Sequence, residues 1–219
     1  PSHLKESKMS TQESALYSEK DKATSIATKC NSLEKLKEAV KSFSGCPLSR
    51  TATNMVFADG NPNAKLMIVG EAPGEEEDKT GIPFVGAAGK LLDKMLEAIE
   101  YDRKNTYITN VVFWRPPGNR KPNNEEIDIC LPFLLKHVSL IKPKVLVLAG
   151  AIAAQALLNS KEGITQLRGK WEEVILEDCK EPIKTIAIFH PAFLLRQPAR
   201  KREAWVDLKN IASTLKLIN

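Results

Sequence analysis

Four short apolar runs separated by helical patterns constrain the fold of this chain more than any other feature. They are apolar throughout instead of alternating with polar residues, and they lie at residues 65–70, 106–113, 144–150 and 185–190. Runs of this kind are typical of parallel strands that are covered on both faces. Because parallel strands need crossover connections, we expect a three-layer α/β/α sandwich with a central four-stranded parallel sheet.

The segments around these runs predict the helices of the two outer layers. In residues 88–99 the apolar side chains recur at helical spacing. This spacing predicts a helix with one apolar face, formed by Leu91, Leu92, Met95, Leu96 and Ile99. Comparable patterns lie at residues 32–43, 123–141, 151–158 and 202–218. Proline removes a backbone donor from a helix interior, so we expect Pro132 either to start a new helix or to bend the helix around it.

Composition divides the chain into a tail and one domain. Residues 1–30 are rich in Ser, Thr, Lys and Glu and poor in large apolar groups, so burial offers little to offset the entropy of ordering them. We expect a flexible polar tail over residues 1–30 and a single domain over residues 31–219. The formal net charge is +5, from 32 basic and 27 acidic residues. It favours a polyanionic partner, because Lys and Arg side chains that neutralise phosphates release counterions from a nucleic acid.

The cysteines and the hydropathy argue against two classes of protein. Cys30, Cys46, Cys130 and Cys179 are scattered and form no CxxC pair, so a secreted disulfide framework is not expected. No apolar run approaches the roughly 18 residues that a membrane-spanning helix needs. We therefore expect a cytoplasmic protein with no membrane partner. We also expect a monomer.

Unusual loops follow three of the predicted strands. They are GEAPGEEED at residues 70–78, WRPPGNRKP at residues 114–122 and HPAFLLRQPAR at residues 190–200. In an open parallel sheet, ligands bind beyond the carboxyl ends of the strands. We therefore expect the three loops to converge on one edge of the sheet and to form the functional site there.

These loops belong to an ordered set of motifs. The set comprises GEAPG at 70–74, GIPFVGAAGKLLDKML at 81–96, YITNVVFWRPPGNRKP at 107–122 and FHPAFLLRQP at 189–198. From about Cys46 to Trp205 it resembles the family-4 uracil-DNA glycosylases. The resemblance implies an enzyme of base excision DNA repair, which flips uracil out of DNA and hydrolyses its N-glycosidic bond. The partner would be uracil-containing DNA, and the product an abasic site in an uncut backbone.

The resemblance also implies a uracil pocket. Phe84 occupies the family position that stacks on the base, and Asn110 the position whose amide accepts from uracil N3–H and donates to O4. Cytosine presents the reverse donor and acceptor order, so this pairing rejects it. The expected pocket residues are Gly70, Ala72, Phe84 and Asn110. On pattern alone, Phe84 also fits an ordinary core position and Asn110 a turn cap.

Two residues are expected to act on the bond itself. His190 matches the family's second catalytic motif, where a donor aimed at uracil O2 stabilises the departing anion. Glu71 stands where more distant superfamily members carry an Asp that positions water, so we expect its carboxylate to orient the attacking water. Without the flanking motifs, His190 equally fits a buried core histidine.

The same loops offer contacts for the DNA strand. The segment after His190 combines an apolar tip with cations, which suits insertion into the duplex and contact with phosphates. A helix start with two core leucines is the alternative for that segment. The expected DNA-binding residues are Arg115, Asn119, Arg120, Leu194, Leu195 and Arg196.

The chain departs from the family at its iron–sulfur ligands. Typical members hold a cluster with four cysteines, and here Cys46 and Cys130 match the second and fourth positions. The first position falls on Phe43 and the third on Trp114, and neither side chain ligates iron. We therefore expect no cluster, no other metal and no cofactor, with the two rings filling the vacated volume.

Two alternatives to a hydrolytic enzyme remain open. A uracil-DNA binding or sensing protein with little turnover would use the same pocket, although the related branch carries a basic insertion that this chain lacks. A generic nucleotide-binding α/β enzyme would use GEAPG as a phosphate loop, but neither GxGxxG nor GxxxxGK[ST] follows a strand here.

Overall fold

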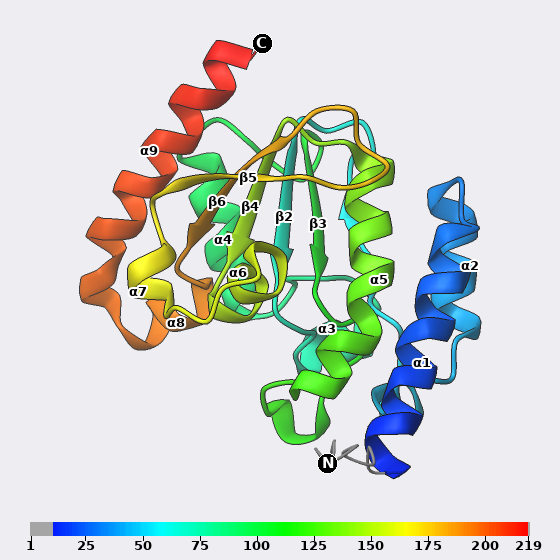
Figure 1. Cartoon of the computed structure of the whole chain (residues 1–219). Helices are drawn as coiled ribbons and strands as arrows, with labels where there is room; N and C mark the ends of the chain where they lie inside the picture. The colour runs from blue at the N-terminus through cyan, green and yellow to red at the C-terminus, as the bar shows by residue number, and fades with distance from the viewer. Residues whose placement is uncertain (1–10, 219) are drawn as a thin grey trace, which may run out of the picture.

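The computed structural model describes the backbone of residues 11–218 and the side chains of residues 19–218. Within this range one mixed sheet has the strand order β1-β3-β2-β4-β6-β5 (Figure 1). Its strands are β1 (Asp59–Gly60), β2 (Leu66–Gly70), β3 (Thr106–Asn110), β4 (Val145–Ala149), β5 (Trp171–Val174) and β6 (Ile183–Ile188). The strands β3, β2, β4 and β6 pair in parallel, which confirms the predicted centre. The antiparallel edge strands β1 and β5 were not predicted.

Burial explains why the centre was predictable and the edges were not. Every residue of β2, β3 and β4 is buried, so both faces of these strands are covered. At the edges, β1 has only two residues and β5 exposes Glu172 and Glu173. Neither edge strand therefore has the apolar run by which a central parallel strand is recognised.

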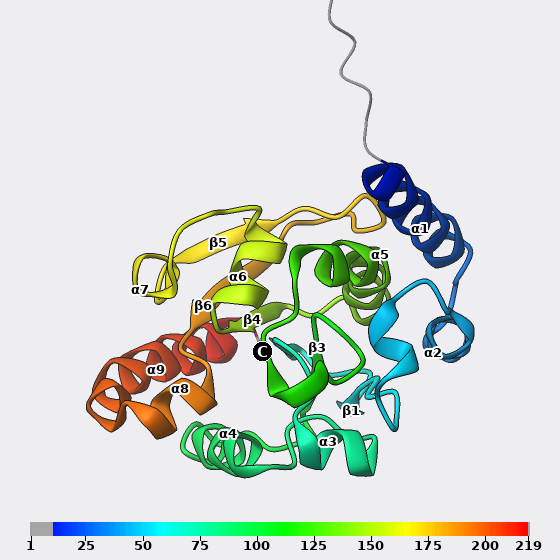
Figure 2. The same ribbon diagram turned by 90° about the horizontal axis from the view of Figure 1, so that it is seen from below.

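The helices cover the sheet in two layers. They are α1 (Thr11–Thr28), α2 (Leu33–Ser42), α3 (Glu75–Thr80), α4 (Ala87–Glu97), α5 (Asn124–Ile141), α6 (Ala151–Leu158), α7 (Ile164–Leu167), α8 (Pro191–Arg196) and α9 (Lys201–Ile218), with 3₁₀ turns η1 (Pro47–Arg50), η2 (Pro117–Asn119) and η3 (Pro198–Arg200). Figure 2 shows α5 and α6 on one side of the sheet and α4 and α9 on the other, as a three-layer sandwich requires. No helix within residues 11–218 is both long and apolar enough to cross a membrane.

Two hydrophobic clusters, one on each face of the sheet, hold these layers together. Successive side chains of a strand point to opposite faces, so Met67 and Val69 of β2 join the cluster under α5 and α6. Leu66 and Ile68 join the cluster under α4 and α9. Each face of β2 is therefore fixed by its own layer of helices, and the carboxyl end of the strand is held between them.

The N-terminal region differs from the expected flexible tail. Helix α1 packs against α5, and its residues Ala23 and Ala27 are buried. Composition hides this contact because alanine carries little apolar area, although its small size lets two helices approach closely. Within the expected tail, the structure therefore has a helix over Thr11–Thr28 that packs on the domain through its second half. Residues 1–10 of that tail lie outside the described residues.

Of the two expectations for Pro132, a new helix start is wrong, because α5 runs through Pro132 as one helix.

A capping box closes the first turn of α5: Asn123 Oδ1 accepts from the Glu126 N–H, and a Glu126 carboxylate oxygen accepts from the Asn123 N–H, each at 2.8 Å. Arg120 donates to both oxygens of Glu126, at 2.6 and 2.9 Å. The helix start and the loop before it are thus tied together.

A buried histidine lies between α5 and the sheet. Nε2 of His137 is 2.7 Å from the hydroxyl of Tyr107, and the Phe57 ring stacks on the imidazole at 4.4 Å between centroids. Burial lowers the pKa of His137 to about 3. The folded protein therefore holds this ring in its neutral form at neutral pH.

This histidine should make the fold sensitive to acid. An unfolded histidine titrates near pH 6.5, so between about pH 6.5 and the folded pKa of about 3 the unfolded chain binds the extra proton. The free energy of unfolding should fall by up to about 1.4 kcal/mol per pH unit as the pH is lowered through this window. Denaturant unfolding at a series of pH values measures the slope.

The His137→Gln variant is the control for this prediction. Glutamine stays neutral, so the slope of stability against pH should become shallower by about one proton. Other acid-sensitive groups contribute to both proteins and cancel in the difference. An unchanged slope in the variant would contradict the prediction.

Candidate active site at the carboxyl edge of the sheet

Three loops follow the carboxyl ends of the parallel strands, where the sequence predicts the site. Strand β2 ends at Gly70, whose register partner is Asn110 at the end of β3. His190 follows β6 by two residues. The helices α3 and α8, which begin after β2 and β6, lie at the lower end of the sheet in Figure 1. The predicted residues thus come from one edge of one sheet.

Gly70 lets Asn110 and Phe84 meet at the end of β2. A Cβ atom at Gly70 would lie 2.4 Å from Oδ1 of Asn110 and 2.5 Å from Cζ of Phe84, so any side chain there would displace both groups. Asn110 is 1% exposed and Phe84 is 5% exposed. The structure therefore brings together three of the four expected pocket residues. Ala72, the fourth, is half-buried two residues beyond Gly70.

The amide of Asn110 has an unsatisfied acceptor. Its Oδ1 atom is buried and has no hydrogen-bond partner among the described residues. Leaving a buried polar atom unpaired costs about 1–3 kcal/mol. A planar ligand that donates an N–H to this oxygen, and that lies against the Phe84 ring, would satisfy the amide and use the ring as its apolar support.

His190 is arranged as a neutral donor. Its Nδ1 atom accepts from the Ala192 N–H at 3.1 Å, so a neutral ring carries its proton on Nε2. Burial and, to a smaller extent, the nearby charge of Arg196 lower the pKa of His190 to about 4, against an opposite effect of Glu77. The imidazole lies 5.6 Å from the Phe84 ring, at an interplanar angle of 27°.

Gly150, the residue after β4, fits against this histidine. Its φ of +100° is a conformation that L side chains rarely adopt. A Cβ atom at this position would lie 3.0 Å from Cβ of His190. The turn after β4 therefore limits where the His190 side chain can sit.

Glu71 is half-buried in the first loop. Burial raises the pKa of its carboxyl group, whereas the charges of Lys121 and Arg196 lower it. These two cations come from the second and third loops, so the electrostatic environment of Glu71 is assembled from all three loops. The charge of Arg196 acts on both Glu71 and His190.

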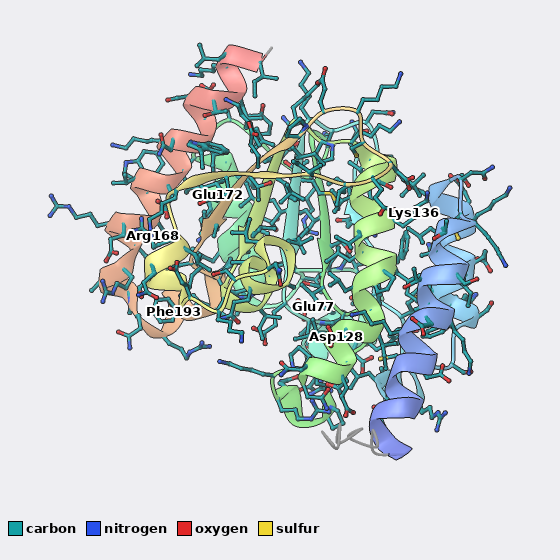
Figure 3. The ribbon with its side chains drawn as sticks, viewed as in Figure 1. Glu77, Asp128, Lys136, Arg168, Glu172 and Phe193 are labelled. Atoms are coloured by element: carbon teal, nitrogen blue, oxygen red, sulfur yellow. The ribbon has the colours of Figure 1, made fainter. Side chains whose placement is uncertain are left out.

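Glu77 joins two loops of the site, although its motif EEED resembles a run of solvated charges. One carboxylate oxygen accepts from the Gly74 N–H at 3.0 Å, and the other accepts from the N–H groups of Val85 and Gly86, each at 2.8 Å. Figure 3 shows this buried residue at the lower end of the sheet. Its neighbours Glu75 and Glu76 are exposed, so only burial distinguishes it.

The third loop corrects one expected DNA contact. Leu194 is 1% exposed and packs in the cluster under α4 and α9, so it cannot serve as a wedge. Leu195 is 43% exposed on α8, and Arg196 next to it is exposed. Helical geometry turns adjacent residues to different directions, and the motif alone did not reveal which leucine faces outward.

The second loop is held by its own polar residues. Arg115 Nε donates to Oδ1 of Asn119 at 2.6 Å, and its guanidinium lies 3.8 Å from a Glu75 oxygen. Arg120, also an expected DNA contact, is committed to Glu126, although 45% of its side chain is exposed. These residues therefore shape the rim of the site as well as offering charge to a ligand.

The segment that carries His190 is supported by Arg168, which lies outside the motifs named above. The guanidinium of Arg168 lies 5.1 Å above the Phe189 ring and pairs with Asp207 at 2.6 Å. The ring of Phe193 also stacks on the Phe189 ring, with 4.9 Å between the ring centroids. Figure 3 shows Arg168 and Phe193 beside α7 and α8. The contacts of Arg168 with Phe189 and Asp207 cross long distances in sequence, so no local pattern predicts them.

The four positions at which typical family members carry cluster cysteines form an apolar core here instead of a four-thiol site. Cys46 and Cys130 are fully buried with their sulfur atoms 3.9 Å apart. Phe43 and Trp114 belong to the same hydrophobic cluster. No group of three or more His, Cys, Asp or Glu side chains within the described residues is arranged to hold a metal ion. Two thiols and two rings do not fit a cluster that needs four thiolates.

Comparison with known proteins shows which family and which relatives this chain is similar to. The model of the family described as "Uracil DNA glycosylase superfamily" matches residues 57–209. A type-4 uracil-DNA glycosylase of Archaeoglobus fulgidus is 42% identical over 184 residues, which cover 82% of this chain and 92% of the relative. The type-4 enzyme of Thermotoga maritima is 41% identical over 187 residues, or 84% of this chain and 95% of the relative. A type-5 uracil-DNA glycosylase of Pyrobaculum aerophilum is 30% identical over 148 residues, or 61% and 63%.

The protonation state of His190 can be tested directly. We expect its ring to stay neutral at neutral pH, with the proton on Nε2, and to titrate at about pH 4. Long-range proton–nitrogen NMR spectra of the protein measure both properties, and the chain has only 3 histidines to assign. The His190→Gln variant identifies the signals by their loss. Titration near pH 6.5, the ordinary value for histidine, would contradict the prediction.

Proposed function

The chain belongs to the uracil DNA glycosylase superfamily and is a uracil-DNA glycosylase of DNA repair, and we propose that the pocket at the carboxyl edge binds the flipped base. The observation that carries this assignment is the unpaired, buried Oδ1 of Asn110 beside the Phe84 ring. Together they suit a flat base that presents an N–H group.

In the proposed complex, Asn110 reads the edge of the base. Its Oδ1 accepts from uracil N3–H, and its Nδ2 donates to uracil O4. Cytosine has an acceptor at N3 and a donor at its exocyclic amine, so both contacts would be mismatched. Phe84 stacks on the base, and Gly70 keeps space for both side chains. The burial of Asn110 supports this role because a mismatch in a dry site has no water to repair it.

His190 acts on the leaving group. Its Nε2–H donates to uracil O2 as negative charge develops on the ring. The Ala192 N–H bond to Nδ1 supports this role because it leaves Nε2 as the donor in the neutral ring. A neutral histidine also carries no positive charge that would have to be desolvated when the pocket closes around the base.

Glu71 acts on the other side of the bond. Its carboxylate orients a water molecule, whose oxygen bonds to C1′ while the N1–C1′ bond breaks and its electron pair leaves with uracil. The water proton is transferred away, and uracil is released after taking up a proton. The half-buried position of Glu71 between the charges of Lys121 and Arg196 supports this role.

DNA is held by the rims of the second and third loops. Leu195 is the proposed wedge that fills the space of the flipped base, because it is exposed at the end of α8. Arg196 and Arg115 contact phosphates, and Asn119 orients Arg115 through the bond to its Nε. Arg120 contributes charge from a side chain fixed by Glu126. A monomer and a cytoplasmic location remain predictions.

No metal or other cofactor takes part in this proposal. The donor set around Cys46 and Cys130 supports that view, since aromatic rings occupy the other two ligand positions. Edge-to-face packing of Phe43 on Phe133, at 5.1 Å, provides apolar contacts in this region. The four cysteines are free thiols in the structure, which fits a reducing compartment.

The first test is excision of uracil from a labelled oligonucleotide under single-turnover conditions. We expect alkali-labile abasic sites and an intact backbone before the alkali treatment. Asn110→Ala and His190→Ala should each lower the rate constant by about 100-fold or more, as for loss of one directed hydrogen bond in a dry active site. Lys136→Gln is the control, because Lys136 lies on α5 outside the three loops (Figure 3) and pairs with Asp178.

The result that would overturn the assignment is an inert protein, with both variants indistinguishable from it. A stable stoichiometric complex with uracil DNA, formed without release of the base, would instead support the binding or sensing alternative. The control variant shows whether a substitution outside the three loops affects excision.

The second test concerns iron. Protein purified without oxygen should contain no stoichiometric iron and no visible absorption, because two thiols are too few for a cluster. The double variant Phe43→Cys with Trp114→Cys restores four thiols and should take up iron and sulfide on reconstitution. Finding about four irons per chain in the unsubstituted protein would contradict this part of the proposal.

A further inference from the structure

Phe84 holds a backbone conformation that its residue type disfavours. Its φ is +56°, in the left-handed region that side chains with a Cβ atom avoid. Among the described residues, the other non-glycine residues with positive φ are Glu100, Asn119, Lys142 and Asn159, none of them aromatic. Contacts elsewhere must therefore hold this backbone in place.

Arg103 makes two such contacts from the loop before β3. Its Nη1 donates to the carbonyl oxygen of Pro83 at 3.0 Å, and its Nη2 donates to the carbonyl oxygen of Phe84. The guanidinium thus binds two successive carbonyl groups with its planar fork of donors. A lysine, with one ammonium group, lacks this geometry.

Glu77 holds the same segment from its other end. Its Oε1 accepts from the N–H groups of Val85 and Gly86. The peptide group between Phe84 and Val85 is therefore fixed at its oxygen by Arg103 and at its nitrogen by Glu77. Rotation of this peptide group, which relaxation of the Phe84 backbone requires, would break both hydrogen bonds.

Arg103 is itself fixed by two carboxylates. Nη1 lies 2.7 Å from Asp59 of β1, and Nε lies 2.9 Å from Asp93 of α4. Helix α4 also approaches the segment closely, since a Cβ atom at Gly89 would lie 1.7 Å from the carbonyl oxygen of Phe84. The Phe84 carbonyl is thus enclosed by a glycine of α4 and by a guanidinium anchored on α4 and on the sheet edge.

We infer that Arg103 is a positioning residue of the glycosylase, which fixes the Phe84 ring as the stacking face for the flipped base. Its hydrogen bonds and ion pairs are to Asp59, Asp93 and the two carbonyl oxygens, and none is to Gly70, Asn110 or His190. It therefore acts on the base only through Phe84. This inference rests on the proposed role of Phe84 in uracil binding.

A positioning role and a merely structural role differ in how they combine with loss of the ring. If Arg103 acts through Phe84, removing its fork has no further effect on excision once the ring is absent. If Arg103 only stabilises the fold, its effect on the rate should be independent of Phe84, and the two losses should multiply. A double-mutant cycle separates these two cases.

The experiment uses the full chain with Arg103→Gln, Phe84→Ala and the double variant. Single-turnover excision from a uracil oligonucleotide is measured together with the affinity for the same oligonucleotide with thymine in place of uracil. Arg103→Gln should lower the excision rate constant by roughly 10- to 100-fold, as misplacement of a group in the site does. The affinity for thymine DNA should stay within about twofold, and the double variant should be no slower than Phe84→Ala alone.

Two further variants keep the test decisive. Lys136→Gln removes an ion pair that does not involve Arg103, so its rate should stay within about twofold of the unsubstituted protein. Arg103→Lys keeps the charge and loses the fork, and its excision rate should lie between those of the unsubstituted protein and Arg103→Gln. If Arg103→Gln fails to fold, the lysine variant and its combination with Phe84→Ala complete the cycle.

Multiplying rate losses, or an unchanged rate in both Arg103→Gln and Arg103→Lys, would overturn the inference. Failure of the proposed function looks different. In that case the unsubstituted chain does not excise uracil, or Phe84→Ala excises it at the full rate.

Discussion

The site depends on the absence of a side chain at the end of one strand. Gly70 stands beside Asn110 because β2 and β3 pair in parallel, and its missing Cβ leaves room for the Asn110 amide and the Phe84 ring. The backbone pairing continues beyond the strands: the Val111 and Val112 N–H groups donate to the carbonyl oxygens of Gly70 and Glu71, at 2.9 and 3.2 Å. The amide of Asn110 is therefore oriented by a ladder of main-chain bonds on a buried strand.

The sequence predicts what depends on local pattern, and it misses what depends on distant partners. The four central strands are recognisable because both of their faces are apolar, whereas the edge strand β5 exposes Glu172 and Glu173. The motifs place Asn110 and His190 at the right edge, but they do not reveal that Leu194 faces the core. Arg103 binds carbonyl groups about twenty residues earlier in the chain, and backbone acceptors leave no trace in the sequence.

Two histidines, His137 in the core and the half-buried His190, show how the same desolvation serves different ends. His137 and His190 both have lowered pKa values because burial disfavours the charged ring. His137 lies against Tyr107 and Phe57 inside the core, where a neutral ring is simply compatible with packing. His190 accepts a backbone N–H at Nδ1, which selects one tautomer and leaves Nε2 as the donor. The partner of the first nitrogen, more than burial, separates a structural histidine from one fit for catalysis.

The helix at the beginning of the described region has a practical consequence for anyone who shortens this protein. Ala23 and Ala27 are covered where α1 packs on α5, so cutting the chain at residue 30 would uncover apolar surface on a helix that also carries Cys130 and His137. Exposed apolar surface of this kind promotes self-association. A shortened enzyme would therefore be expected to fail first in solubility, with the chemistry at the carboxyl edge of the sheet still intact in the fraction that stays folded.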